Sequence, residues 1–349
     1  MPIQRVNYSL GSSERGSSLK MKDLAHAAAD QVWKPDLYQQ TFDGQEAAEA
    51  GTEDRKPANH SSNGDGRCCG TFGELLQGQL PDGSASGDSN FLVTMPIALF
   101  ARAHFIPIAG TVCVTVYPAY KVKAQRLAES LVLALGVSGG NLLLESELPE
   151  GKGLASSSAD LVATARSIAS SFKRRVRISL IEKLMAEIEP SDGVMYPGVV
   201  AYQQRACSLL SFLGQMPPLA IVGIDEGGTV ETVDYDQRRG EVSNRQRAQY
   251  QELFEQARIA IPQGDTASIG RIATASALLH QERVPKEHLD SMRKVSEEVG
   301  ALGVIVAHSG TVIGILLDRT AHDFPWKLQS VVDQVTLFNN LPRVYLTMH

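Results

Sequence analysis

The chain has 349 residues, of which 43% are hydrophobic and 21% charged, and its formal net charge is −6. This length exceeds what one hydrophobic core usually supports, so we expect two domains. The acidic balance argues against a nucleic-acid-binding surface as the main function. No apolar run is long enough to span a membrane, and the N-terminus lacks a signal-peptide core, so we expect a cytoplasmic protein without a membrane partner. The four cysteines form no C-x-x-C pair, and no histidine cluster has zinc-ligand spacing.

Residues 1–66 differ in composition from the rest of the chain. They are rich in Ser, Gly, Asp, Glu, Lys and Ala and cannot bury enough apolar surface to offset the entropy lost on ordering. We therefore predict a disordered N-terminal extension. A short amphipathic helix over residues 20–33 is one exception within it, and docking to a partner through this tail is an alternative to a plain disordered segment.

The remainder predicts a mixture of strands and helices in two domains, 67–214 and 215–349, joined by the Gly- and Pro-containing segment 214–218. Strands and helices do not alternate strictly, so the pattern favours an α+β fold over a doubly wound sheet. We predict strands at 92–105, 111–116, 141–147, 206–212, 219–225 and 343–347 and a strand pair within 303–318. We predict helices at 123–135, 159–170, 179–188, 243–260, 266–281 and 285–298.

The most informative segment is a glycine- and serine-rich loop between a predicted strand and a predicted helix. Free backbone N–H groups and the helix dipole favour an anion at such a place. It is not a P-loop, because Lys152 is followed by Gly153, and Ser156 stands where a dinucleotide fingerprint needs its third glycine. The alternative is an ordinary helix cap. We expect a nucleotide triphosphate to lie along Pro149, Glu150, Gly151, Lys152, Gly153, Leu154, Ala155, Ser156, Ser157, Ser158 and Ala159.

Two segments on either side of this loop carry acidic and amide side chains. In the stretch 70–78, Glu74 and Gln77 share one face if the turn is helical, and together they suit an ammonium or a hydroxyl group. Farther on, Glu187 and Glu189 end a helix, where the dipole disfavours negative charge unless a cation such as Mg²⁺ relieves it. Asp192 follows in a glycine turn and is placed to accept the proton of an attacking hydroxyl. The alternatives are plain surface turns.

A third segment, 307–314, is a glycine-bearing loop between two apolar runs. Such a loop between buried strands places backbone amides near a ligand. The alternative is a simple hairpin turn, with His308 as a polar loop residue.

These segments, in this order, resemble the GHMP kinase superfamily. Its middle motif is Pro-x3-Gly-Leu-Gly-Ser-Ser-Ala, which Pro149, Gly153, Leu154, Ser156 and Ser157 match, while small residues replace two other motif positions. Its C-terminal motif, a Ser/Gly-rich loop between strands, is similar to the residues 308–311. The opening Gly-Thr-Phe-Gly-Glu-Leu-Leu-Gln-Gly and the segments 91–97 and 189–198 are similar to the L-threonine kinases of cobalamin (coenzyme B12) biosynthesis. One departure is Cys69, where those kinases tend to have proline.

The resemblance implies an N-terminal domain like the second domain of ribosomal protein S5 and a ferredoxin-like C-terminal domain, with the active site between them. It implies ATP and Mg²⁺ as cofactors, with Ser157 (or Ser156) and Glu189 as metal ligands and Glu187 as a rival to Glu189. It implies Asp192 as the catalytic base and Glu74 and Gln77 as groups on the substrate side.

The implied reaction is phosphorylation of free L-threonine to L-threonine O-3-phosphate, which would feed a decarboxylase that makes the aminopropanol arm of the corrin ring. One alternative is a kinase of the same superfamily for homoserine, serine or another small alcohol. Another is an inactive nucleotide-binding regulatory protein. The sequence does not indicate an oligomeric state.

Overall fold

The computed structural model describes residues 61–81, 90–228, 242–338 and 341–349. The helix expected at 20–33, and docking through the tail, therefore lie outside the described residues. The last residues of the expected extension are described, and Gly64–Gly66 already belong to the first strand, β1 (Gly64–Gln79). No described helix is long and apolar enough to cross a membrane.

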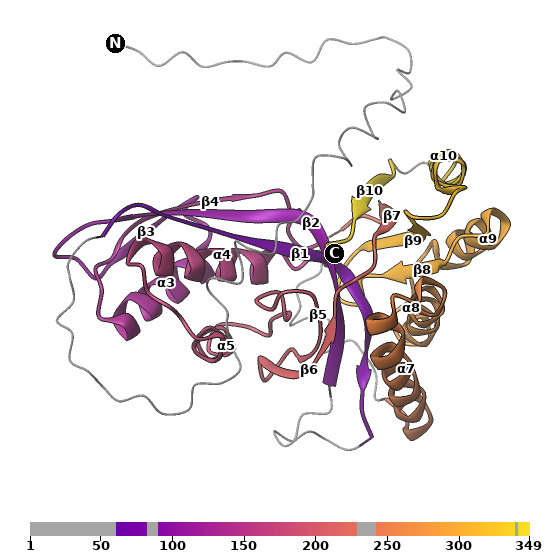
Figure 1. Ribbon diagram of the computed structural model, residues 1–349, viewed down its shortest axis with the longest axis horizontal. Helices are drawn as coiled ribbons and strands as arrows, with labels where there is room; N and C mark the ends of the chain where they lie inside the picture. Colours follow the sequence, from indigo (N-terminus) through magenta and orange to yellow (C-terminus); the bar gives the residue numbers. More distant parts are fainter. Residues whose placement is uncertain (1–60, 82–89, 229–241, 339–340) are drawn as a thin grey trace, which may run out of the picture.

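A six-stranded sheet forms the first half of the molecule. Its order is β3-β4-β2-β5-β6, and β1 pairs with β2 along nearly its whole length. All pairings are antiparallel except that of β3 with β4. Two helices of this half pack along one side of the sheet, and a third packs against those two helices (Figure 1). The further strands are β2 (Asn90–Pro107), β3 (Val114–Tyr117), β4 (Gly140–Ser146), β5 (Val199–Gln203) and β6 (Ser208–Gly214), and the helices are α3 (Val122–Leu135), α4 (Ser156–Ser171) and α5 (Ile178–Ala186).

A four-stranded antiparallel sheet of order β10-β7-β9-β8 forms the second half. Helices α9 and α10 cover one face, whereas α7 and α8 also contact β1 of the first half (Figure 1). The strands are β7 (Leu219–Asp225), β8 (Gly303–Val306), β9 (Val312–Asp318) and β10 (Arg343–Leu346), and the helices are α7 (Asn244–Gln263), α8 (Thr266–Gln281), α9 (Leu289–Val299) and α10 (Phe324–Thr336). This mixture confirms the α+β class.

Strand β7 is apolar up to its last residue, Asp225, and its first six residues are buried. Side chains alternate along a strand, and Leu219 and Ile221 join the large core shared with the first half, whereas Ala220, Val222 and Ile224 face α9 and α10. The two halves are therefore packed through one continuous core.

Helix α4, which begins within the predicted phosphate loop, lies very close to β1. This close packing fixes the position of the helix. A Cβ added to Gly66 would lie 2.2 Å from the carbonyl oxygen of Ala163, and one added to Gly64 would lie 2.2 Å from that of Ser167. Only glycine permits this approach.

Three elements differ from the sequence-based expectations. The stretch 70–78, expected as a turn, is the interior of β1. Strand β5, whose five residues are all buried, was missed; it begins directly after the turn-rich segment 189–198. Helix α10 was also missed, although it has the favoured proline in its first turn and buries Val331 and Val335 one turn apart.

Candidate active site

The loop between β4 and α4 delivers an uncapped helix start. Ala155 has a φ of 55°, so the chain turns through the left-handed region just before α4 begins, and no side chain in the described residues caps that end. The first amides of a helix have no partner within the helix. This end of α4 can therefore receive an anion through the N–H groups of its three serines.

The same loop is held by backbone hydrogen bonds from two distant parts of the chain. From β1, the Thr71 and Gly73 amides donate to the carbonyl oxygens of Leu154 (3.2 Å) and Gly153 (2.9 Å). From the loop between β8 and β9, the Thr311 amide donates to the carbonyl oxygen of Lys152 (3.1 Å). The two sides fix the backbone that the sequence pattern assigns to phosphate.

Glycine makes the contact between the two loops possible. A Cβ on Gly310 would lie 2.2 Å from the Lys152 carbonyl oxygen, and one on Gly153 would lie 2.5 Å from the Ala307 side chain. The expected loop 307–314 thus lies directly against the expected phosphate loop.

Glu189 lies at the start of α4. The Ser157 hydroxyl donates to one oxygen of the Glu189 carboxylate, and the Lys123 ammonium binds the other at 2.5 Å. The rival residue, Glu187, is exposed at the end of α5 and its side chain takes part in no described contact with the loop. The structure therefore brings Glu189, rather than Glu187, to the serines.

Asp192 lies beside the next serine. Its backbone amide donates to the Ser158 hydroxyl oxygen at 3.1 Å, and that hydroxyl lies 3.4 Å from the Asp192 carboxylate. Burial raises the pKa of the Asp192 carboxyl to about 7, and the negative charges of Glu74 and Glu189 add to this effect. A carboxyl group in this state can exchange a proton near neutral pH.

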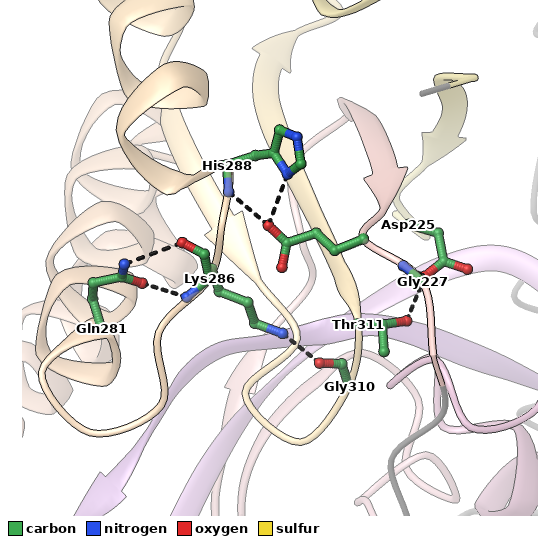
Figure 2. Close-up of polar contacts among 8 residues, drawn as sticks. Asp225, Gly227, Gln281, Lys286, His288, Gly310 and Thr311 are labelled. Carbon is green, nitrogen blue, oxygen red and sulfur yellow. Dashed lines mark hydrogen bonds and ion pairs between the residues drawn. The ribbon is translucent and has the colours of Figure 1, made fainter. Parts of the chain in front are cut away.

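Lys152 reaches from the loop to the second half of the molecule. Its ammonium binds the carboxylate of Asp225, at the end of β7, at 2.7 Å and the carbonyl oxygen of Gly228 at 2.6 Å. Asp225 also accepts a hydrogen bond from the Thr311 hydroxyl at 2.6 Å (Figure 2). Lys152 and Thr311 together hold the carboxylate, which lowers the Asp225 pKa even though burial opposes the effect.

A bulge, and not a helix, aligns Glu74 and Gln77. Between them β1 carries one extra residue, so that Glu74 pairs with Thr94 and Gln77 with Leu92 on β2. Because positions two apart on a strand share a face, the bulge sets both side chains on the same side of the sheet.

Glu74 is buried and tied to the second half of the molecule. Its carboxylate oxygen accepts from the backbone amide and from Nδ1 of His308, both at 3.0 Å. The other ring nitrogen of His308 lies 2.9 Å from the Ser276 hydroxyl on α8. His308, expected as a loop residue, is 2% exposed and forms part of a buried chain.

Gln77 contacts an amide that the sequence did not single out. Its Nε2 donates to Oε1 of Gln204, in the turn between β5 and β6, at 3.0 Å. The backbone carbonyl oxygen of Gln204 in turn accepts a hydrogen bond at 2.9 Å from the backbone amide of Ser191, the residue immediately before Asp192.

A buried lysine supports the loop 307–311 from behind. The Lys286 ammonium donates to the Gly310 carbonyl oxygen, and the Gln281 side chain binds both the amide and the carbonyl of Lys286 (Figure 2). Lys286 is 6% exposed, and burial lowers its pKa. Its sequence context, an ordinary Pro-Lys-Glu, gave no signal of this role.

A second lysine braces the first part of the phosphate loop. Lys121 binds Glu150 at 2.6 Å and Asp160 at 2.5 Å. Burial alone would lower the pKa of Lys121, but the hydrogen bonds to these two carboxylates outweigh it and raise the pKa. Lys121 and Lys123 stand two apart before and within α3, a spacing that alone carries no functional signal.

Protein side chains provide only part of a metal site here. Within residues 61–81, 90–228, 242–338 and 341–349, no group of three or more His, Cys, Asp or Glu side chains could hold a metal ion. One carboxylate and one hydroxyl do meet at the start of α4. Such a pair suits Mg²⁺, which takes few protein oxygens and fills its shell with phosphate oxygens and water.

Comparisons with known proteins match both halves of the chain. The N-terminal domain of GHMP kinases matches residues 119–198, and the C-terminal domain of GHMP kinases matches residues 257–324. An L-threonine kinase from Citrobacter freundii is 27% identical over 259 residues, which is 74% of this chain and 87% of the relative. An L-threonine kinase from Salmonella typhimurium is 25% identical over 282 residues, covering 80% and 91%. The crystal structure of homoserine kinase from Cytophaga hutchinsonii superposes with a TM-score of 0.63 at 16% identity, covering 86% of this chain and 97% of that one.

Proposed function

We propose that this chain, which carries both domains of the GHMP kinases and is a small-molecule kinase of that superfamily, transfers the γ-phosphoryl group of ATP to the hydroxyl of free L-threonine. One observation carries the catalytic part of the proposal. Ser157 contacts Glu189 and Ser158 contacts Asp192, both at the uncapped start of α4. The acceptor rests on the similarity to the two L-threonine kinases.

In this proposal the loop 149–159 binds the phosphates. The amides at the start of α4 donate to phosphate oxygens, and the two glycines of the loop allow the close approach. The Lys152 ammonium is already engaged by Asp225. It would add positive charge over the phosphates only by giving up or sharing that carboxylate.

The Ser157 hydroxyl and the Glu189 carboxylate would hold Mg²⁺. A metal ion there would neutralise charge on the phosphate oxygens. Lys123 binds the same carboxylate, so the charge of Glu189 is already balanced by a cation of the protein itself. This contact keeps a buried charge from standing alone.

Asp192 is the proposed base. A pKa near 7 leaves much of the carboxyl ionised at neutral pH, yet able to hold the proton that leaves the acceptor hydroxyl. Phosphoryl transfer depends mostly on alignment and charge neutralisation, so Asp192 also orients the hydroxyl for in-line attack.

Glu74 and Gln77 lie on the acceptor side in this proposal. Glu74 contributes negative charge close to Asp192, as its effect on that pKa indicates. Because it also binds His308, it joins the acceptor side to the loop of the second half.

The acceptor is tested by ADP release with Mg²⁺-ATP across L-threonine, L-serine, L-homoserine and mevalonate. We expect the highest kcat/KM with L-threonine and a product that phosphorus NMR identifies as the O-phosphate. A higher kcat/KM with homoserine would make the chain a homoserine kinase. No ADP release with any acceptor would favour the inactive nucleotide-binding protein.

The product, L-threonine O-3-phosphate, would feed the decarboxylase that makes the aminopropanol arm of cobalamin. The cytoplasmic location stays a prediction that goes with this role. The role in cobalamin synthesis is tested by deleting the gene in its host and measuring cobalamin-dependent growth with and without added threonine O-phosphate.

A further inference from the structure

Two buried glutamines meet next to the proposed acceptor site and leave hydrogen-bonding capacity unused. Gln77 and Gln204 are each 4% exposed and share a single hydrogen bond. One bond between two side-chain amides leaves one carbonyl oxygen and one NH₂ group over. Here these are Oε1 of Gln77 and Nε2 of Gln204, and both lack a partner among the described residues. Rotating both amides would only exchange which residue supplies which group.

Such a pair is costly unless something fills it. A buried polar atom without a partner costs about 1–3 kcal/mol, and native interiors rarely leave one so. Both atoms face the protein interior. A bound molecule would satisfy both atoms if it offered a donor to the Gln77 oxygen and an acceptor to the Gln204 NH₂ group.

The position of the pair indicates which molecule this is. The backbone carbonyl oxygen of Gln204 accepts a hydrogen bond from the Ser191 backbone amide, so Gln204 adjoins the segment that carries the proposed base Asp192. The bulge in β1 sets Gln77 on the same face as Glu74. The Gln77 amide also lies 3.4 Å from the Ser276 hydroxyl, which contacts His308. The pair thus lies on the acceptor side of Asp192.

We propose that Gln77 and Gln204 form a subsite for the head group of a free α-amino acid. The spare carbonyl oxygen accepts from the α-ammonium group, and the spare NH₂ group donates to the α-carboxylate. This assignment rests on the proposed function, because it needs an acceptor that carries both groups beside its hydroxyl. It makes Gln204 a specificity residue that no sequence motif marks.

The test is a cycle of variants against substrate analogues. L-Threoninol lacks the carboxylate and 3-hydroxybutanoate lacks the ammonium group, while both keep the reacting hydroxyl. We expect the wild-type enzyme to prefer L-threonine over either analogue by about 10–100-fold in kcat/KM. Gln204→Met should lower kcat/KM for threonine by about 10-fold, mainly through KM, and leave the value for threoninol nearly unchanged. Gln77→Met should likewise lower kcat/KM for threonine and leave the value for 3-hydroxybutanoate nearly unchanged. If instead Gln204→Met spares 3-hydroxybutanoate and Gln77→Met spares threoninol, the subsite stands, but Gln77 binds the carboxylate and Gln204 the ammonium group.

Gln203 offers a matched control. It precedes Gln204, is equally buried, and its Oε1 already accepts from the Ser208 hydroxyl at 3.1 Å. Gln203→Met should change kcat/KM for all three substrates by one common factor, or leave all three values unchanged. Thermal melts confirm that each variant is folded. If Gln204→Met does not fold, the isosteric Gln204→Glu replaces it and should penalise threonine more than threoninol, because it sets a carboxylate against a carboxylate.

The outcomes separate this inference from the proposed function. An equal loss on threonine and both analogues in Gln204→Met and Gln77→Met would overturn the subsite and show that the amides enclose only water. A preference of the wild-type enzyme for homoserine would overturn the proposed acceptor but leave the subsite standing, because homoserine carries the same head group.

Discussion

The Ser157 hydroxyl donates a hydrogen bond to the Glu189 carboxylate, which joins the first turn of α4 to the segment that follows α5. One residue later, the Ser158 hydroxyl accepts a hydrogen bond from the Asp192 backbone amide and lies 3.4 Å from the Asp192 carboxylate. Two consecutive serines of one motif are thereby each paired with one acid of another. In the proposed function the two acids have different roles, with Glu189 at the metal and Asp192 at the acceptor.

Replacement of the proposed base should reduce turnover without reducing nucleotide binding. Asp192→Asn keeps the size of the side chain and the backbone bond to Ser158 but cannot accept a proton. We expect kcat to fall by about 10²–10⁴-fold while the KM for ATP stays nearly unchanged. Steady-state kinetics with saturating threonine checks this, and an unchanged kcat would remove Asp192 from the role of base.

The same variant should be more stable than the wild-type protein at alkaline pH. The Asp192 pKa is raised, so the folded protein holds the charged form less well than the unfolded chain, and this cost grows as pH rises from about 4 and is complete above pH 7. A pKa raised from about 4 to about 7 corresponds to about 4 kcal/mol, and partial solvent contact reduces this to about 1–3 kcal/mol. Asp192→Asn should therefore gain stability at pH 8 and lose most of that gain near pH 4. Denaturant unfolding at both pH values measures the difference in free energy of unfolding between the variant and the wild-type protein. A stability gain that is independent of pH would show that the raised pKa of Asp192 is not the cause of the gain.

The two acids at the end of α5 should differ in their effect on metal dependence. Glu189→Gln removes the charge beside Ser157 and should raise the Mg²⁺ concentration for half-maximal activity by about 10-fold or more, since a charged ligand bond is worth about 1.5–3 kcal/mol. Glu187→Gln is the matched control, because Glu187 is exposed and makes no side-chain contact with the loop in the described residues. Mg²⁺ titrations at fixed ATP compare the two. Equal shifts in both variants would mean that Glu189 does not hold the metal.

A methyl group between the two loops should weaken ATP binding. In Gly310→Ala the new Cβ would lie 2.2 Å from the Lys152 carbonyl oxygen, so the two loops must separate. We expect the KM for ATP to rise by about 10-fold, which corresponds to about 1.4 kcal/mol. The control is Gly264→Ala, where the Cβ meets nothing within 4 Å. The φ of 65° at that position costs stability but should leave the KM for ATP unchanged.

Removal of residues 1–60 should leave the catalytic constants within about twofold of the full chain, since every residue of the proposed site lies after that segment. The cut spares Ser62, whose amide donates to the Ser171 carbonyl oxygen at the end of α4 at 3.1 Å. Kinetics of the shortened protein, together with its melting temperature, checks this. A collapse of activity with an unchanged melting temperature would give the tail a part in catalysis.

The local parts of the site could be predicted from the sequence, and the long-range parts could not. The loop 149–159 and the acids at 189 and 192 lie within one stretch of chain, where glycine, serine and carboxylate spacing indicates the chemistry. Glu74 and His308 are 234 positions apart, and Gln77 and Gln204 are 127 apart. Nothing near either member signals its partner, because the pairing depends on how β1 crosses between the two halves.

The alignment of Glu74 and Gln77 shows how a sequence pattern can be explained by the wrong element. A spacing of three places two side chains on one face of a helix, and it does the same on a strand that carries a bulge. The shared face was predicted, but the helix was wrong. Hydrophobic periodicity could not decide between the two elements, since Leu75 and Leu76 are both fully buried.

The bond from Thr311 to Lys152 has a consequence for how the protein is made. The proposed phosphate loop, residues 149–159, leaves the ribosome well before the loop 307–311 that packs against it, so the nascent chain holds an unfinished site for almost half of its synthesis. A message truncated before codon 307 would yield a product that still carries every residue of the phosphate motif. Such a product would lack the brace that shapes the motif, and a survey that counts genes by this motif alone would mistake the fragment for a working kinase.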